Sequence, residues 1–177
     1  MNMQVEVPEV DNSKADLSLG AADFITDGDQ YLTFCLDNEH YGVDILAVTE
    51  IRGWENPTLI PNSPSFVKGV INSRGVIVPI LDLRIRFQIG KASYDPTTVV
   101  IVLAVKNGHD SCTMGFVVDA VSDVLNADED EIKPAPVFDG LVAPKYINGL
   151  VNVNDHVVTL LKVEQLLSLD DEVVNDE

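Results

Sequence analysis

The chain has 177 residues, of which 46% are hydrophobic, so it can bury a core, and global disorder is excluded. Its formal net charge of −18 argues against binding to nucleic acid or to an anionic membrane surface, because both depend on lysine and arginine. Neither a signal peptide nor an apolar run of the roughly 18 residues that a membrane span needs is visible, so we expect a cytoplasmic protein without direct membrane insertion.

The first half of the chain reads as an acidic tail followed by short strands. Residues 1–28 are polar and lack periodicity, which predicts a flexible tail. Apolar stretches separated by turn residues, at 31–36, 41–53 and 69–83, predict strands. The last stretch, GVINSRGVIVPILDL, predicts a hairpin with a glycine-containing tip. Because Pro79 has no amide hydrogen to donate, its strand is expected to be a sheet edge or to be interrupted there.

The second half repeats the order of elements in the first. Gly42 aligns with Gly115, 73 positions later, and Gly69 aligns with Gly149, 80 positions later, after an insertion. The repeat begins at the apolar strand predicted for residues 98–105. One chain therefore contains two similar small β units.

This pattern of short strands with little helix predicts an all-β fold built from small barrels or a sandwich. Units of this size are marginal alone, so they are expected to share one core within a single domain at 29–168. The first barrel is placed at about 31–95 and the second at about 96–163. A short C-terminal helix follows, and then an acidic tail at 169–177.

Residues with catalytic or metal-binding potential form no recognisable site. The histidines fall at predicted turns without a second ligand at metal-binding spacing; they are His40, His109 and His156. The acidic run 128–131 lacks the spacing of a calcium loop and favours a solvated loop or a helix start. Cys35 and Cys112 lie in strand-like stretches and are expected to be reduced, buried thiols. We therefore expect no enzyme, cofactor or metal; a ligand-binding barrel, which requires a polar pocket, is the alternative.

One segment reverses the acidic balance of the chain. Residues 52–91 hold six basic side chains against two acidic ones, which suggests a protein partner or else a mixed solvated surface. Within it, Arg74 lies at the predicted hairpin tip, where the second copy has Asn154. The arginine is either a partner contact or a solvated loop residue. Trp54, close to Arg52, is either an interface anchor or a packing residue.

Several long motifs closely resemble the CheW family of bacterial chemotaxis coupling proteins. They are YGVDILAVTEIRG (41–53), SPSFVKGVINSRGVIVPILDLRIRF (63–87), TTVVIVL (97–103), GFVVDAVSDVL (115–125) and IKPAP (132–136). The resemblance covers roughly residues 30–168. It implies two packed five-stranded SH3-like β-barrels on a shared core.

The resemblance also implies a non-enzymatic adaptor that couples chemoreceptors (methyl-accepting chemotaxis proteins) to the histidine kinase CheA. The regulatory domain of that kinase would pack against a barrel end, the receptor tip would enter the groove between the barrels, and further CheW copies would join the rings. The protein would be recruited to polar receptor arrays at the inner membrane. An adaptor of another chemosensory pathway, controlling pili or second messengers, is the alternative.

Candidate partner-binding residues follow from matching these motifs position by position. They are Val48, Glu50, Arg52, Gly69, Val70, Asn72 and Arg74. The resemblance implies that Glu50 and Arg74 pair with each other and that the pair orients the hairpin tip. Pro79 also matches the family pattern.

Overall fold

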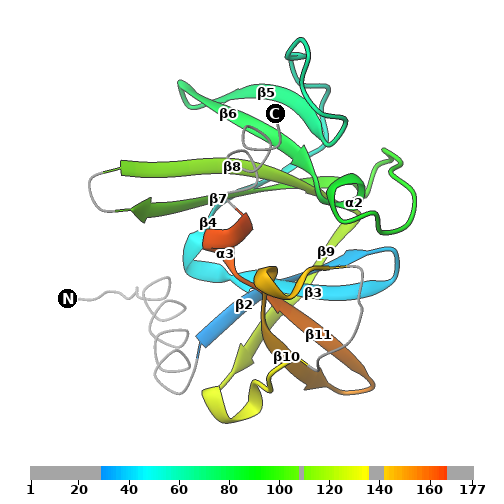
Figure 1. The fold of residues 1–177 in the computed structure, drawn as a ribbon, viewed down its shortest axis with the longest axis vertical. Coiled ribbons are helices and arrows are strands. Elements are labelled where there is room, and N and C mark those ends of the chain that lie inside the picture. Colours follow the sequence, from blue (N-terminus) through cyan, green and yellow to red (C-terminus); the bar gives the residue numbers. More distant parts are fainter. Residues whose placement is uncertain (1–28, 108–109, 136–141, 167–177) are drawn as a thin grey trace, which may run out of the picture.

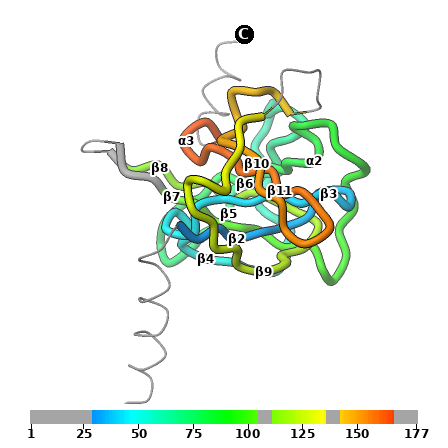
Figure 2. Tube along the Cα trace, turned by 90° about the horizontal axis from the view of Figure 1, so that it is seen from below, coloured from blue at the N-terminus to red at the C-terminus, as the bar shows by residue number. Residues whose placement is uncertain are grey.

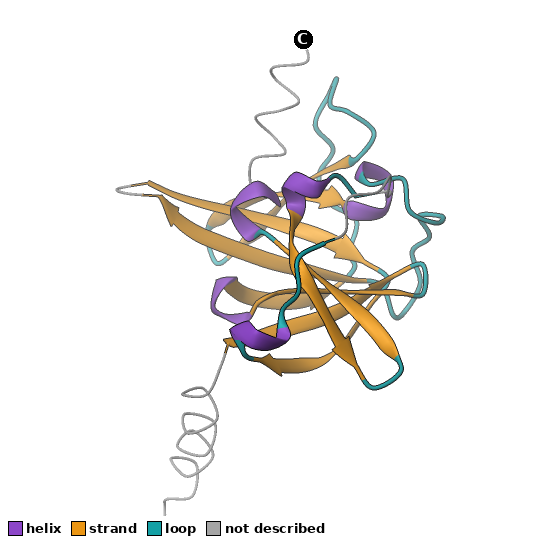
Figure 3. Cartoon of the chain, turned by 60° about the horizontal axis from the view of Figure 1, so that its bottom comes forward, coloured by secondary structure: helices purple, strands orange, loops and turns teal. Residues whose placement is uncertain are grey.

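The computed structural model describes residues 29–107, 110–135 and 142–166 (Figure 1), so the tails expected at 1–28 and 169–177 lie outside the described residues. The strands are β2 (Asp29–Leu36), β3 (Glu39–Asp44), β4 (Val48–Gly53), β5 (Val67–Ser73), β6 (Val76–Asp82), β7 (Val99–Asn107), β8 (Asp110–Val118), β9 (Ala120–Ala127), β10 (Ile147–Val153) and β11 (His156–Leu161). Between them lie helix α2 (Leu83–Arg86) and the 3-10 turns η1 (Ile45–Ala47), η2 (Glu129–Glu131) and η3 (Pro144–Tyr146), and helix α3 (Val163–Leu166) follows β11. Figure 3 shows that the helices are short pieces at the ends of strands, which confirms the mostly β fold with a short C-terminal helix.

The strands form two five-stranded sheets, with the orders β10-β11-β3-β2-β9 and β4-β7-β8-β6-β5. The first occupies the lower part of Figure 1 and the second the upper part. Each copy of the repeat gives its first hairpin to the other copy: β2–β3 joins β9–β11, and β7–β8 joins β4–β6. The expected division into 31–95 and 96–163 therefore differs from the observed pairing. The contiguous barrel runs from β4 to β8, and the other combines both ends of the domain.

The exchange of hairpins follows from the connections inside each copy. Between β3 and β4 lies only η1, and between β8 and β9 only Asp119, and both connections carry the chain from one sheet into the other. The exchanged pairs are equivalent, because β2 pairs antiparallel with β9 as β7 does with β4. Alternation of apolar and polar residues is satisfied by either set of partners, so the sequence pattern does not reveal the exchange.

Each sheet closes into a barrel through one isolated bridge. Thr58, downstream of β4, exchanges two 2.9 Å backbone hydrogen bonds with Val70 of β5, and Lys133 bridges to Leu150 in the same way in the other barrel. The glycine that precedes each bridged strand residue makes this approach possible. A Cβ on Gly69, which has φ +136°, would collide with the Thr58 carbonyl, and one on Gly149 would lie 2.9 Å from the Lys133 carbonyl oxygen. Gly69 and its equivalent Gly149 thus mark barrel closure.

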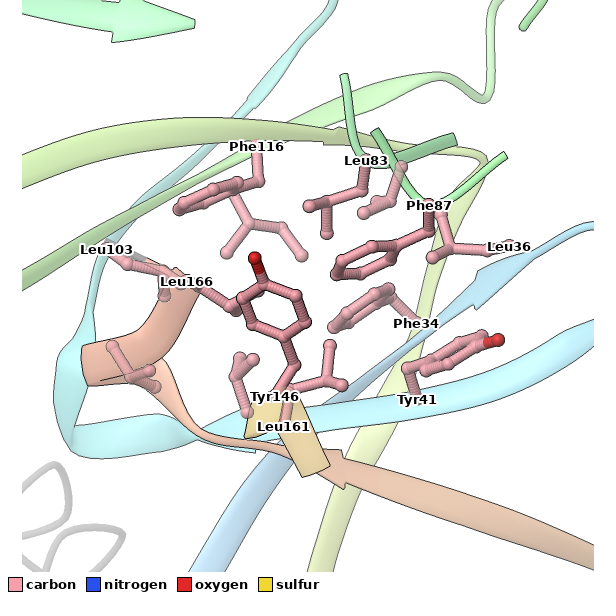
Figure 4. Close-up of a cluster of buried hydrophobic side chains, with 14 of the residues drawn as sticks. Phe34, Leu36, Tyr41, Leu83, Phe87, Leu103, Phe116, Tyr146, Leu161 and Leu166 are labelled. Atoms are coloured by element: carbon pink, nitrogen blue, oxygen red, sulfur yellow. The ribbon is translucent and has the colours of Figure 1, made fainter. Parts of the chain in front are cut away.

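A hydrophobic core joins the two barrels (Figure 4). It takes Phe34 from β2 in one sheet and Leu103 and Phe116 from β7 and β8 in the other. Leu166 of α3 is fully buried in it. Burial of one such leucine contributes about 1.5–3 kcal/mol, so α3 stabilises the domain through packing rather than through its own helical bonds. The expected shared core is thereby observed, and each barrel adds a smaller cluster of its own.

The strand that contains Pro79 is neither a sheet edge nor interrupted at that residue, since β6 runs unbroken from Val76 to Asp82, so that expectation is wrong. Strand β6 lies between β5 and β8, and Pro79 is opposite Val70 of β5. The parallel ladder to β8 begins only at the next residue, Ile80. In the second copy the equivalent residue is Thr159, which does pair with β3, opposite Tyr41. Both parallel ladders contain three residue pairs, so the proline shifts the start of its ladder along the strands without ending the sheet.

Candidate protein-docking surfaces

One end of the β4–β8 barrel holds a depression of about 190 Å³, which we call end 1. Its lining comes from β4, β5, β6, β7, β8 and the β5–β6 turn and consists of Thr49, Glu50, Ser73, Arg74, Val76, Val78, Val102 and Thr113. Two predicted site residues, Glu50 and Arg74, are thus brought to one surface. At the start of β6, Val76 is 54% and Ile77 is 61% exposed, so the surface is partly apolar.

The carboxylate of Glu50 is held by two neighbours, neither of which is the expected Arg74. Ser73 Oγ donates a 2.7 Å hydrogen bond to Glu50 Oε1, and Arg52 NH1 lies 3.6 Å from Glu50 Oε2. No ion pair joins Glu50 to Arg74 among the described residues, so the expected pairing is not formed. Glu50 and Arg52 alternate on one face of β4, which places them side by side. The Arg74 side chain, at the exposed tip, remains available to a partner.

The hairpin tip holds Arg74 in a left-handed backbone conformation. Arg74 has φ 56° and Gly75 has φ 84°, as a mirror-image two-residue turn requires. The Gly75 amide donates a 2.8 Å hydrogen bond to Asn72 Oδ1, so the predicted site residue Asn72 shapes the tip. In the second copy Asn154 has φ 54°. Asparagine adopts this conformation more readily than arginine, so the fold alone does not explain the arginine.

The other predicted residues lie in supporting positions. Val48 is half-buried and packs against the core between the barrels, while Gly69 is buried where its barrel closes. Val70 is half-buried and forms the closing bridge itself. None of these three lines the depression at end 1. They shape the barrel from which Glu50 and Arg74 project.

The second barrel has an equivalent depression of about 200 Å³, which we call end 2. It is lined by Thr33, His40, Ser122, Asp123, Val124, Leu125, Val153, Asn154, His156 and Val158. The repeat matches Asp123 with Glu50 and Asn154 with Arg74. Thr49 and Ser122, also equivalent, both sit where the register shifts by a β-bulge. The two ends therefore share a shape and differ in chemistry.

End 2 contains a pair of histidines that sequence reasoning missed. The rings of His40 and His156 stack with centroids 3.9 Å apart. Their strands, β3 and β11, lie side by side in Figure 2 and pair in parallel, although the two residues are far apart in the chain. Cys35 Sγ lies 3.8 Å from His40 Nδ1 and 3.4 Å from Ser122 Oγ. The alignment of the two copies was the signal that could have pointed to His156, because it matches this histidine with Val76 at end 1 and so marks a difference between the two ends.

A groove of about 420 Å³ lies where the chain passes between the sheets. Its lining combines η1, α3 and residues of both sheets, including Tyr31 of β2 and Ala104 of β7. Leu46 of η1 stands at this groove and is 86% exposed. Asp29 and Asp44 make its border acidic, and burial, together with these two carboxylates and Glu129, raises the pKa of Tyr31.

Three other features singled out in the sequence have structural roles. Trp54 stacks on Tyr94 with ring centroids 4.4 Å apart and packs against its own barrel's core, which supports the packing interpretation. The acidic run begins a 3-10 turn, where the Asp128 amide donates to Glu131 Oε1 at 2.8 Å. Cys35 and Cys112 lie in strands as expected, but both are half-buried rather than buried.

Within the described ranges, no three side chains from histidine, cysteine, aspartate and glutamate come together in a way that would hold a metal ion. His109 lies outside those ranges. Of the helices that the structure describes, none is long and apolar enough to cross a membrane.

Comparison with known proteins gives a consistent result. The family model of the CheW-like domain matches residues 30–171. The chain is 46% identical to chemotaxis protein CheW of Klebsiella aerogenes over 151 residues, which are 85% of this chain and 89% of that protein. It is 35% identical to the probable chemotaxis protein CheW of Rhizobium etli, covering 81% of this chain and 91% of that one. Among solved structures, the scaffolding protein TtCheW of Thermoanaerobacter tengcongensis superposes with a TM-score of 0.69 and 32% identity, over 76% of this chain and 89% of that chain.

Proposed function

This chain belongs to the CheW family and is a chemotaxis scaffold, and we propose that it couples chemoreceptors to the histidine kinase CheA through three surfaces: end 1, end 2 and the groove. It acts by holding partners together rather than by catalysis. The relatives named for chemotaxis, at 46% and 35% identity, favour this role over an adaptor for pili or second messengers.

The observation that carries the proposal is the asymmetry between the two barrel ends. Both ends have the same backbone, yet only end 1 places an arginine, Arg74, in the left-handed tip conformation. Arginine is enriched at the centres of protein interfaces, where its planar fork binds carboxylates and stacks on aromatic rings. Exposed Val76 and Ile77 add apolar area beside it. End 1 is therefore proposed to bind the regulatory domain of the kinase.

The groove is proposed to bind the receptor tip. The family resemblance implies a receptor partner whose tip is a helical hairpin. An amphipathic helix binds a groove through apolar anchors on one face. Leu46 offers such a contact because it is 86% exposed at the groove. The acidic border, with Asp29 and Asp44, would orient basic residues of the helix.

The two barrel ends, which share a shape but differ in chemistry, also support assembly into rings. A subunit with two different docking ends makes head-to-tail contacts, which close into a ring when the rotation between neighbours allows it. End 2 would then contact the next kinase regulatory domain or another copy of this chain. Such rings would bring the protein from the cytoplasm to receptor arrays at the inner membrane.

The test is kinase autophosphorylation in receptor-containing membranes, with and without this protein. The wild-type chain should raise the rate strongly, and attractant should suppress that rise. Arg74→Glu should abolish most of the increase while the chain stays folded, because the change is at an exposed tip. Lys91→Glu, the same reversal of charge at an exposed residue that lines neither barrel end nor the groove, is the matched control for end 1. An unchanged kinase rate with wild-type protein that still sediments with the membranes would refute the coupling role.

A further inference from the structure

End 2 carries a feature that has no counterpart at end 1. The stacked rings of His40 and His156 lie 3.9 Å apart, and the repeat places Thr113 and Val76 at the equivalent positions of end 1. Histidine is the side chain that ordinarily gains its positive charge between pH 8 and pH 5. Of these two pairs, therefore, only the one at end 2 contains ionisable side chains of this kind.

Two protonated imidazoles at this separation repel each other, because like charges at short range raise the energy of the charged state. The stack is therefore compatible with at most one positive ring. Titratable side chains on the surrounding elements are Cys35 on β2, Glu39 on β3, Asp123 on β9 and Asp155 in the turn before β11. When both rings carry a charge, the repulsion between them falls on the stack itself.

The position of the pair links its charge to the shape of end 2. The parallel ladder between β3 and β11 consists of three residue pairs, and His40, opposite Val158, begins it. His40 also contacts Cys35 of β2, which in turn contacts Ser122 in the bulge of β9. Separation of the rings would thus disturb four strands that line the depression, β2, β3, β9 and β11.

We propose that the His40–His156 stack makes end 2 a pH-sensitive docking surface. With the rings stacked, end 2 binds the barrel end of a kinase regulatory domain. When both rings are protonated, the stack opens, two positive charges enter a surface that also contains Val124, which is 47% exposed, and docking weakens. The effect of pH on docking rests on the proposed function, whereas opening of the stack is a property of the free chain.

The first experiment observes the free full-length chain. Histidine ring signals are followed by NMR from about pH 8 to about pH 5. A cross-ring contact between His40 and His156 should be present at the upper end of the range and absent at the lower end. In the His156→Val variant, His40 should titrate as an isolated ring, with a curve different from that of the wild type. A cross-ring contact that persists when both rings are protonated overturns the proposal, as does an identical His40 curve in both proteins.

The second experiment measures docking of the purified kinase regulatory domain in an Arg74→Glu background, so that end 2 dominates binding. Between about pH 7.5 and about pH 5.5 the affinity of this chain should fall about tenfold more than that of the His40→Thr/His156→Val variant. These replacements are the residues that the other barrel already has at the equivalent positions. An equal fall in both proteins overturns the pH-sensitive docking. Absence of binding at every pH by the unmutated chain would refute the proposed function, while the ring signals still decide whether the stack opens.

Discussion

Arg84 and Asp82 form a two-point ion pair inside the domain: Arg84 Nε donates to Asp82 Oδ1 and NH2 donates to Oδ2, both at 2.9 Å. Their side chains are 1% and 0% exposed. Asp119 accepts a further bond from Arg84 NH1 at 2.8 Å, and the Tyr94 hydroxyl donates to Asp82 at 2.6 Å. Burial alone would lower the pKa of Arg84, but the hydrogen bonds and charges of Asp82 and Asp119 outweigh it and raise that pKa. The charged network ties α2 to β6 and to the β8–β9 connection.

Removal of this guanidinium should destabilise the domain. Arg84→Met leaves the Asp82 carboxylate buried without its cation, which should lower the free energy of unfolding by about 3–5 kcal/mol. Urea denaturation measures the change. Arg52→Met is the control, because its 3.6 Å contact with Glu50 lies at the surface and is worth at most about 1 kcal/mol. Equal losses in the two variants would contradict the importance of burial.

Barrel closure should depend on Gly69 and not on Gly53. In Gly69→Ala the new methyl group meets the Thr58 carbonyl in a conformation with φ +136°, so a loss of at least about 1–3 kcal/mol in unfolding free energy is expected. A Cβ on Gly53 meets nothing within 4 Å, so Gly53→Ala should be nearly neutral. Thermal denaturation compares the two. A Gly69→Ala chain as stable as the wild type, but unable to bind its partners, would make Gly69 a contact residue instead.

Stability should fall in alkaline solution. Burial, with a smaller effect of Glu39 and Asp37, raises the pKa of Tyr41 from 10.0 to about 12. A group whose pKa is higher in the folded state stabilises the fold below the unfolded pKa and loses that contribution as the pH rises through the folded pKa. The loss attributable to Tyr41 therefore lies between about pH 10 and about pH 12. Tyr41→Phe should reduce the decline in denaturation midpoint over this window, and a slope identical to that of the wild type would exclude the contribution.

The groove should lose receptor binding when its exposed leucine becomes charged. Leu46→Asp places a carboxylate where an apolar helix face is expected and should weaken co-sedimentation with receptor membranes about tenfold or more. Leu59→Asp is the matched control, because Leu59 is 79% exposed and does not line the groove. Similar losses in both variants would show a general effect of added charge.

The candidate site illustrates which contacts a repeat in the sequence reveals. Comparison of the copies singled out Arg74, and the structure places it on the same depression as Glu50. The comparison of the copies did not reveal that Ser73 and Arg52, rather than Arg74, hold the Glu50 carboxylate. Which side chains meet across neighbouring strands depends on the register of the strands. For the same reason the three histidines read as separate turn residues, although two of them stack.

The order of strands and turns was determined by the sequence alone, because apolar alternation and turn residues act locally and occur twice in the same order. The alignment of Gly69 with Gly149 was also visible, although the purpose of these two glycines in barrel closure was not. Only the tertiary structure decided which hairpin joins which barrel, since β2 satisfies its alternation equally well beside either copy and the choice depends on contacts between distant segments. That exchange is what brings His40 next to His156 and gives the two barrels one core.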